Sequence, residues 1–157
     1  MKSIPNWAGL IEQRQYKACP VVIRETEQGT EVLVFRHPLA GIQLVKGTVE
    51  PGEHVQDTAL RELEEEAGIS SAKVLQDLAI WPADYEQQVW HFLLCETQTL
   101  PERWSHVTSD DGGHRFEFFW HPLCEQPDNN WHDVYVRALQ AIQQRLKEAG
   151  LKMENSE

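Results

Sequence analysis

The sequence lacks the features of exported, membrane-spanning or disulfide-stabilised proteins. Its three cysteines, Cys19, Cys95 and Cys124, are odd in number and widely spaced, and they form no C-x-x-C pair, which indicates neither a disulfide framework nor a zinc knuckle. No stretch approaches the roughly 18 consecutive apolar residues of a transmembrane helix, and the N-terminus has no apolar segment long enough for a signal peptide. We therefore expect a cytoplasmic protein with no membrane partner.

Basic residues are also scarce. The 157 residues include 14 Lys and Arg against 25 Asp and Glu, which gives a formal net charge of -11. This charge argues against a nucleic-acid partner, because binding to a phosphate backbone depends on clustered positive charge. An anionic partner would need a cation to mediate its binding. The length fits a single domain over 1–157, and the tail 152–157 is predicted to fray.

The hydrophobic pattern predicts strands before, between and after two helices. The segments Tyr16–Arg24 and Glu31–Arg36 are rich in β-formers and flank the turn-like TEQGT, which indicates an antiparallel pair. Because Pro20 has no backbone N–H to donate, it predicts an edge position or a bulge for the first strand. Further strands are expected over Lys73–Ile80, Gln88–Glu96 and Arg115–His121.

Two segments have helical spacing. The first runs from Val55 to Ala67, and the second begins near the cap signal Asn129–Asn130 and ends at Gly150. The second helix has an apolar stripe: Trp131, Tyr135, Leu139, Ile142 and Leu146. Strands interleaved with helices predict an α/β fold class, in which a mixed β-sheet is covered on both faces.

The first helix concentrates acidic residues in the segment RELEEEAG. At about 100° per residue, Glu62, Glu65 and Glu66 fall within one arc of the helix. The neighbouring arc is apolar and consists of Ala59, Leu60, Leu63 and Ala67. We expect the apolar arc to pack inward and the three carboxylates to lie together along one exposed edge.

Carboxylates this close repel one another. Two charges about 6 Å apart repel by about 3 kcal/mol at an effective dielectric constant near 20. A divalent cation removes this conflict. Since the ligands are all hard oxygens, with no Cys or His at matching spacing, Mg²⁺ is the expected cofactor and Mn²⁺ a possible substitute. The alternative interpretation of a glutamate-rich helix, and the commoner one in general, is a solvated face.

The turn before this helix favours a metal and phosphate site. Gly47 and Gly52 bracket a loop whose carbonyls can face a bound ion and whose N–H groups can face phosphate oxygens. Lys46 adds a cation at the loop entrance. Arg61 is flanked by carboxylates, so it either binds substrate phosphate or clamps a ligand in place. We favour the clamp, with Glu53 as its partner.

The spacing of these residues resembles the Nudix box, G-x5-E-x7-R-E-U-x-E-E-x-G-U, where U is aliphatic. The match covers residues 47–69 and agrees at every constrained position, namely Gly47, Glu53, Arg61, Glu62, Leu63, Glu65, Glu66, Gly68 and Ile69. The resemblance implies a Nudix α/β/α sandwich. It also implies metal-dependent hydrolysis of a nucleoside diphosphate linked to another moiety.

The same resemblance implies roles for single residues. Glu62, Glu65 and Glu66 would take the metal-ligand and base roles, with Glu62 or Glu66 accepting a proton from the attacking water. A main-chain carbonyl of Lys46 or Gly47 would complete the metal site. The clamp described above would support these catalytic groups.

A second acidic segment, SDDGGHRFE, adds candidates for the base. Family members differ in where the base lies, and some use a glutamate on a later loop. Asp110 and Asp111 lie in the glycine-rich part of this segment, and Glu117 follows. An acidic hairpin turn explains the segment equally well.

Three residues are predicted to bind the substrate. A Lys-Gly entry at Lys46 resembles members that act on dinucleoside polyphosphates, and Tyr85 lies near the position where those hydrolases have an aromatic residue. Arg36 is the third predicted substrate-binding residue. A dinucleoside polyphosphate is therefore the first expectation. Nucleoside triphosphates and ADP-ribose or sugar nucleotides are the alternatives.

The alternative from another class of function is a Nudix fold that acts as a ligand sensor or binding module without turnover. All box glutamates are present, which favours an enzyme whose partner is a small nucleotide. The seven histidines are scattered and receive no role. Most tryptophans are expected in the core, with Trp7, Trp81 and Trp104 as candidates for base stacking. Oligomeric state does not follow from these patterns.

Overall fold

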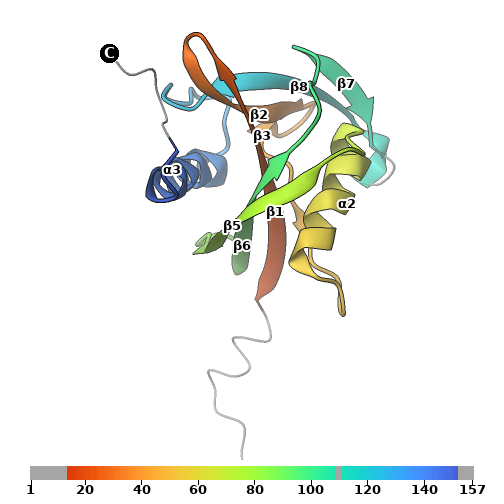
Figure 1. Ribbon diagram of the computed structural model, residues 1–157. Helices are drawn as coiled ribbons and strands as arrows, with labels where there is room; N and C mark the ends of the chain where they lie inside the picture. Colours follow the sequence, from red (N-terminus) through yellow and green to blue (C-terminus); the bar gives the residue numbers. More distant parts are fainter. Residues whose placement is uncertain (1–13, 109–110, 152–157) are drawn as a thin grey trace, which may run out of the picture.

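The computed structural model describes residues 14–108 and 111–151, which form one mixed sheet and two α-helices (Figure 1). The strands are β1 (Gln15–Thr26), β2 (Gly29–His37), β3 (Gly41–Gln43), β4 (Gly47–Thr48), β5 (Lys73–Pro82), β6 (Gln88–Glu96), β7 (Trp104–Val107) and β8 (Arg115–Pro122). The helices are α2 (Val55–Ala67) and α3 (Asp133–Glu148), and a 3-10 turn, η1, spans Asp111–Gly113. The predicted tail 152–157 lies outside the described residues.

Strand β1 lies in the middle of the sheet. The strand order is β5-β6-β1-β2-β8-β7, with β3 paired to β2 and β4 paired to β1. The β1–β6 pair is parallel and the remaining pairs are antiparallel. The expected β1–β2 hairpin is present, with Thr26 opposite Gly29 across the turn.

The prediction that Pro20 marks an edge or bulged strand is wrong. Pro20 is opposite Leu93 in the β1–β6 ladder, and the other side of β1 pairs with β4 at residues 17–18 and with β2 at residues 23–26. Pro20 therefore lies between these two pairings. Its missing N–H is tolerated there because the β4 and β2 ladders do not include this position.

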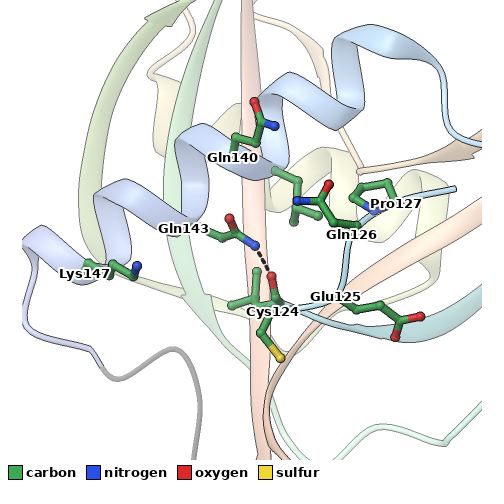
Figure 2. Close-up of a pocket in the computed structure, with 9 residues that line it drawn as sticks. Cys124, Glu125, Gln126, Pro127, Gln140, Gln143 and Lys147 are labelled. Carbon is green, nitrogen blue, oxygen red and sulfur yellow. Dashed lines mark hydrogen bonds between the residues drawn. The ribbon is translucent and has the colours of Figure 1, made fainter.

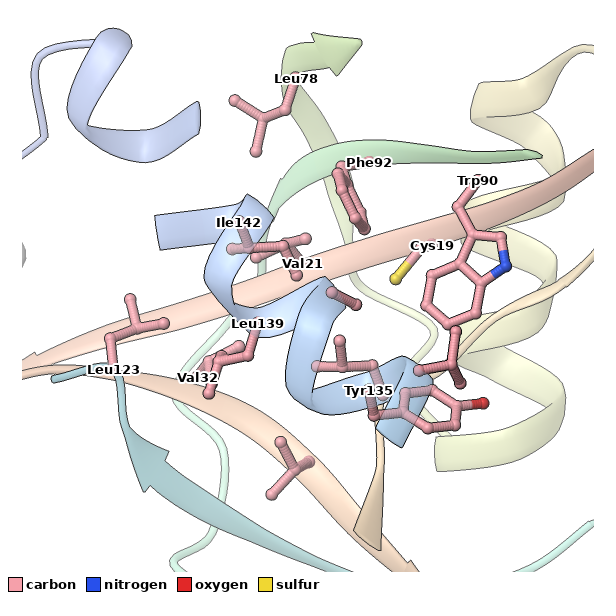
Figure 3. Close-up of a cluster of buried hydrophobic side chains, with 14 of the residues drawn as sticks. Cys19, Val21, Val32, Leu78, Trp90, Phe92, Leu123, Tyr135, Leu139 and Ile142 are labelled. Atoms are coloured by element: carbon pink, nitrogen blue, oxygen red, sulfur yellow. The ribbon is translucent and has the colours of Figure 1, made fainter. Parts of the chain in front are cut away.

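Buried side chains alternate between two layers, one on each face of the sheet. In β1, Cys19 and Val21 belong to the cluster that packs against α3, which Figure 3 shows together with Phe92, Leu139 and Ile142. Ala18 and Val22 belong to the second cluster, which packs against α2. Figure 1 shows the helices on opposite sides of the sheet. The expected α/β/α arrangement is confirmed.

Helix α2 has the predicted bounds. It ends because Gly68 adopts a left-handed conformation at φ 73°, where its N–H bonds to the carbonyl of Glu64 and the N–H of Ile69 bonds to the carbonyl of Leu63. Its buried side differs from the expected apolar arc at three positions, one of which is Glu62, buried at 6% exposure. Leu60 is only half-buried, whereas Thr58 is buried.

Leu63 gives a test of how α2 is held. Its side chain is 1% exposed within the α2-facing cluster. We expect Leu63→Ala to reduce the free energy of unfolding by about 2–5 kcal/mol, because the change leaves a cavity in a packed layer. Urea unfolding at 25 °C measures this loss. If the free energy of unfolding fell by less than about 1 kcal/mol, with the same dependence on urea concentration as wild type, the buried side of α2 would be assigned incorrectly.

Helix α3 starts later than predicted. Asn130 donates its backbone N–H to Asp128 in a turn, and Trp131 forms a β-bridge with Ile42. The N-cap is His132, whose Nδ1 accepts from the N–H of Val134. Trp131 is therefore buried as predicted but outside the helix, because tertiary pairing with β3 holds it in extended backbone.

Neither helix in the described ranges is both long and apolar enough to cross a membrane. The three cysteines are free thiols, and Cys19 and Cys95 are buried. Burial raises the pKa of the Cys95 thiol to about 12 and that of Cys19 further. Both groups therefore remain protonated and unreactive near neutral pH.

Candidate functional site

One cavity gathers side chains from both layers of the fold around the start of β4. It has a volume of about 320 Å³. Its lining residues are Lys17, Phe35, His37, Gln43, Leu44, Lys46, Gly47, Thr48, Glu62, Glu66, Phe116 and Tyr135. Of the residues predicted to form a site, four lie together here: Lys46, Gly47, Glu62 and Glu66.

Arg61 acts as the clamp that the sequence predicts. Its Nε donates to Oε2 of Glu53 at 2.9 Å and one terminal nitrogen donates to Oε1 at 3.0 Å, which makes a bidentate pair. The other terminal nitrogen donates to Glu62 at 2.9 Å and to Glu65 at 3.3 Å. A further bond reaches the carbonyl of Thr48 at 3.2 Å. One guanidinium thus joins the loop before α2 to three carboxylates.

The Glu53 carboxylate makes the pH dependence of this clamp predictable. Hydrogen bonds from Arg61, and then from Thr58 and the backbone N–H of Glu50, lower the pKa of Glu53 from 4.5 to about 2. Because the folded pKa lies below the usual value, the pair stabilises the fold above about pH 4.5. That contribution is lost as the pH falls from about 4.5 through 2.

We therefore expect Glu53→Gln to be less stable than wild type at pH 7 and to converge with it near pH 2. Melting curves between pH 7 and pH 2 measure the difference. Glu64→Gln is the matched control, since Glu64 is an exposed glutamate on α2. A Glu53→Gln deficit that stayed constant down to pH 2 would contradict the assigned role of the ion pair.

Glu62 is not on an exposed edge, contrary to the prediction. It is 6% exposed, and its carboxylate lies against the backbone of Gly47. A Cβ added at Gly47 would come within 2.0 Å of the carboxyl carbon of Glu62. Glycine at 47 is therefore required for close approach of the β4 backbone to α2. The Arg61 bond makes burial of the Glu62 charge tolerable.

Two lysines, Lys17 and Lys46, line the same cavity as Glu62 and Glu66. Lys46 lies against aromatic rings, with its Nζ 5.2 Å from the centre of Trp90 and 5.8 Å from that of Tyr135. Burial, and then the charge of Lys17, lowers the pKa of Lys46. Lys17 donates to the hydroxyl of Thr48 at 2.7 Å. The cavity thus holds two cationic groups close enough to interact.

Besides Glu53 and Arg61, three predicted residues are not among those that line the cavity. Glu65 is half-buried and turned toward Arg61. Arg36 is exposed on β2. Tyr85 packs against His132, with ring centres 5.2 Å apart, and His132 in turn packs against Tyr135. Tyr85 therefore reaches the cavity only through these two rings.

The second acidic segment contributes Phe116 to the cavity lining but none of its described acidic side chains. Glu117 is exposed on β8, opposite Arg36 in the β2–β8 ladder. Asp110 lies outside the described residues, and the side chain of Asp111 does too. The candidate stacking residues Trp81 and Trp104 pack on Phe92 and Phe118 within the fold, and Trp7 lies outside the described residues.

The donor chemistry of the site fits a hard divalent cation. Carboxylates of α2 and the carbonyls beside Gly47 are oxygen ligands of the kind that Mg²⁺ takes, and the backbone at Gly47 closely approaches Glu62. Within residues 14–108 and 111–151, no three His, Cys, Asp or Glu side chains are arranged around a common point that would hold a metal. Arg61 instead bridges Glu62 and Glu65.

Sequence patterns did not indicate several cavity residues, which come from distant elements. Lys17 is on β1, Gln43 on β3 and Tyr135 on α3. The Tyr135 hydroxyl donates to the side-chain oxygen of Gln43 at 3.3 Å. The position of Tyr135 on the apolar stripe of α3 predicted burial only, because periodicity gives no sign that a side chain passes through the core to a site.

Another cavity, of about 220 Å³, lies between α3 and the loop after β8 (Figure 2). Leu123, Cys124, Gln140 and Gln143 are among its lining residues, and the Gln143 amide donates to the carbonyl of Leu123. Its lining includes no residue of the acidic helix. Four of the site residues predicted from sequence line the cavity at β4, and none of them lines this one.

The sequence matches the model of the NUDIX domain over residues 15–140. It is 30% identical over 95 residues to an ADP-ribose pyrophosphatase of Bacillus subtilis, an alignment that covers 57% of this chain and 51% of that protein. The chain thus spans about half the length of this curated relative.

Two solved structures illustrate the similarity of the fold. An ADP-ribose pyrophosphatase from Streptococcus suis superimposes with a TM-score of 0.62 at 14% identity, covering 90% of this chain and 96% of that one. An Ap4A hydrolase from C. elegans has a TM-score of 0.59 at 19% identity, covering 85% and 98%. At these identities the likeness concerns the fold alone.

Proposed function

Because the chain belongs to the Nudix family, we propose that it is a divalent-metal-dependent pyrophosphohydrolase acting on a nucleoside diphosphate linked to another group. The observation that carries this proposal is the cavity at β4, which Glu62 and Glu66 line together with Lys17 and Lys46. Carboxylates suit a metal and lysines suit phosphate oxygens, so this pairing supports binding of an anionic substrate through a cation. The partner is a small nucleotide, and the proposed compartment is the cytoplasm.

Nudix hydrolases generally use divalent metal ions. Glu62, Glu65 and Glu66, with a carbonyl of Lys46 or Gly47, would hold Mg²⁺, and Mn²⁺ would substitute for it. Bound there, the ion would neutralise developing phosphate charge and lower the pKa of water. The Arg61–Glu53 ion pair would hold the loop before α2 in a fixed position relative to the helix.

The proton of the attacking water would pass to a glutamate in the cavity. Glu62 and Glu66 are the two candidates, and we favour Glu66 as the base. Arg61 donates to Glu62, which favours the ionised carboxylate and makes Glu62 better suited to hold a cation than to accept a proton. Glu66 lines the cavity one helical turn further on, where a bound phosphate would be within reach.

Lys17 and Lys46 would bind phosphate oxygens beyond the bond that is cleaved. Two neighbouring cations favour a substrate with more than two phosphates, because each additional phosphate adds negative charge along the chain. This supports a dinucleoside polyphosphate as the first candidate. Tyr85 and Arg36, the other predicted substrate-binding residues, would act only at the margin of the cavity.

ADP-ribose is the second candidate substrate, supported by the name of the Bacillus subtilis relative. Nucleoside triphosphates and sugar nucleotides follow. A sensor without turnover is the alternative of another class. Retention of Glu53, Arg61 and every box glutamate supports an enzyme, since a sensor has no need for a proton acceptor beside its metal ligands.

The proposed function is tested with a substrate panel. Diadenosine tetraphosphate, ATP, ADP-ribose and UDP-glucose are incubated with the protein in Mg²⁺ or in excess EDTA, and the products are separated by anion-exchange chromatography. We expect cleavage at a phosphoric anhydride bond in Mg²⁺ alone, fastest for diadenosine tetraphosphate. Cleavage of no member with Mg²⁺ or Mn²⁺, together with metal-dependent binding of one, would favour the sensor.

A further inference from the structure

The last turn of α2 is held by side chains of another element. The carbonyls of Leu63 and Glu64 accept from the backbone N–H groups of Ile69 and Gly68, as in many helices that end in glycine. Two of the carbonyls that follow, those of Glu65 and Ala67, have side-chain donors from β7. Nε2 of His106 lies 3.1 Å from the carbonyl oxygen of Glu65 and therefore carries the donated hydrogen, and Nε1 of Trp104 donates to Ala67 at 2.9 Å.

Both donors are held firmly. Trp104 stacks on Phe118 with ring centres 5.1 Å apart and ring planes within 10°. In the β7–β8 ladder, Trp104 is opposite Phe118 and His106 is opposite Phe116, which lines the cavity. Because residues two apart on a strand share one face, both side chains reach the same helix.

Gly68 lets the helix approach this strand closely. A Cβ at Gly68 would come within 2.9 Å of Nδ1 of His106, and the backbone there has φ 73°. The glycine thus serves two purposes, since it ends α2 and makes room for the imidazole. Because His106 bonds to the backbone of Glu65 itself, displacement of the ring would move a predicted metal ligand.

We propose that Trp104 and His106 are positioning residues, which fix the last turn of α2 so that Glu62, Glu65 and Glu66 stay in register with the backbone at Gly47. This inference rests on the proposed function, because it concerns the carboxylates assigned to the metal. Neither side chain lines the cavity at β4. They act through the helix backbone, in the way that outer groups orient metal ligands.

Trp104→Phe tests the indole bond while keeping an aromatic ring on Phe118. Its matched control is Trp120→Phe, which removes an indole N–H bonded at 3.1 Å to the carbonyl of Pro101 and not to a carbonyl of α2. For His106, the Leu variant removes the donor and the Gln variant keeps an N–H near the position of Nε2. Mn²⁺ binding is measured by calorimetry at 20 °C, and kcat and KM are measured with the best substrate of the panel.

We expect Trp104→Phe and His106→Leu to weaken Mn²⁺ binding and to lower kcat, each by about 10-fold or more, with a smaller change in nucleotide KM. His106→Gln should recover most of the loss, and Trp120→Phe should match wild type. If Trp104→Phe and Trp120→Phe had equal Mn²⁺ affinity and equal kcat, this inference would be wrong, whereas the proposed function would stand. A wild-type protein that binds no Mn²⁺ would overturn the proposed function and this inference together.

Discussion

Replacing Glu66 by Gln is expected to lower kcat by about 10²–10⁴-fold, the range over which positioned general bases contribute. The amide has the shape of the carboxylate but cannot accept the proton of the attacking water. Glu66 is half-buried on α2 and lines the cavity without belonging to the cluster of buried apolar residues. We therefore expect the variant to fold, with a circular dichroism spectrum like that of wild type.

The same measurement on Glu64→Gln provides the control. Glu64 is exposed and lies outside the cavity lining, so the substitution changes the net charge of the helix equally while leaving the site intact. Its kcat should stay within about two-fold of wild type, because surface substitutions have small effects. If Glu66→Gln retained wild-type kcat at saturating Mg²⁺, the base would have to be sought elsewhere.

Mg²⁺ is expected to stabilise the folded protein by about 2.7 kcal/mol at one hundred times its Kd. Glu62, Glu65 and Glu66 are held near one another only in the fold, where Arg61 bonds to the first two. In the unfolded chain these carboxylates are looser and bind the ion poorly. The melting temperature should therefore rise with Mg²⁺ and reach a plateau.

Melting curves at constant ionic strength separate specific binding from screening. NaCl at matched ionic strength should produce little of the increase, and Glu62→Gln should lose most of it because a ligand charge is missing. A non-hydrolysable dinucleotide should add a further increase only when metal is present. If the melting temperature did not change with Mg²⁺, or if NaCl raised it equally, the acidic helix would be a solvated face and not a metal site.

Local patterns predicted the helix that carries the site. α2 has the predicted bounds because its apolar spacing and its glycine stop agree with the fold. The Glu53–Arg61 pair could also be predicted, since the two residues flank a single helix start. Strands β3, β4 and β7 were not predicted, because segments of two to four residues are too short for an alternating pattern.

The other half of the cavity depends on contacts between distant elements. Lys17 lines the same cavity as the carboxylates because β4 pairs with β1, and Tyr135 reaches Gln43 across the core. Hydrophobic periodicity describes single helices and strands, so it does not predict these pairings between distant elements. The burial of Glu62 was missed for a related reason: a helical wheel gives its direction, whereas the approach of the Gly47 backbone decides its exposure.

Hydrolysis in water enriched in ¹⁸O tests the central claim most directly. If Glu66 activates water for attack on a phosphorus atom, turnover of diadenosine tetraphosphate with Mg²⁺ should place one ¹⁸O atom in a phosphate of one of the two products, as read by mass spectrometry. EDTA should abolish the labelled product, and Glu66→Gln should form it far more slowly. Unlabelled products, or labelling at the same rate in EDTA, would contradict a metal-dependent pyrophosphohydrolase at this site.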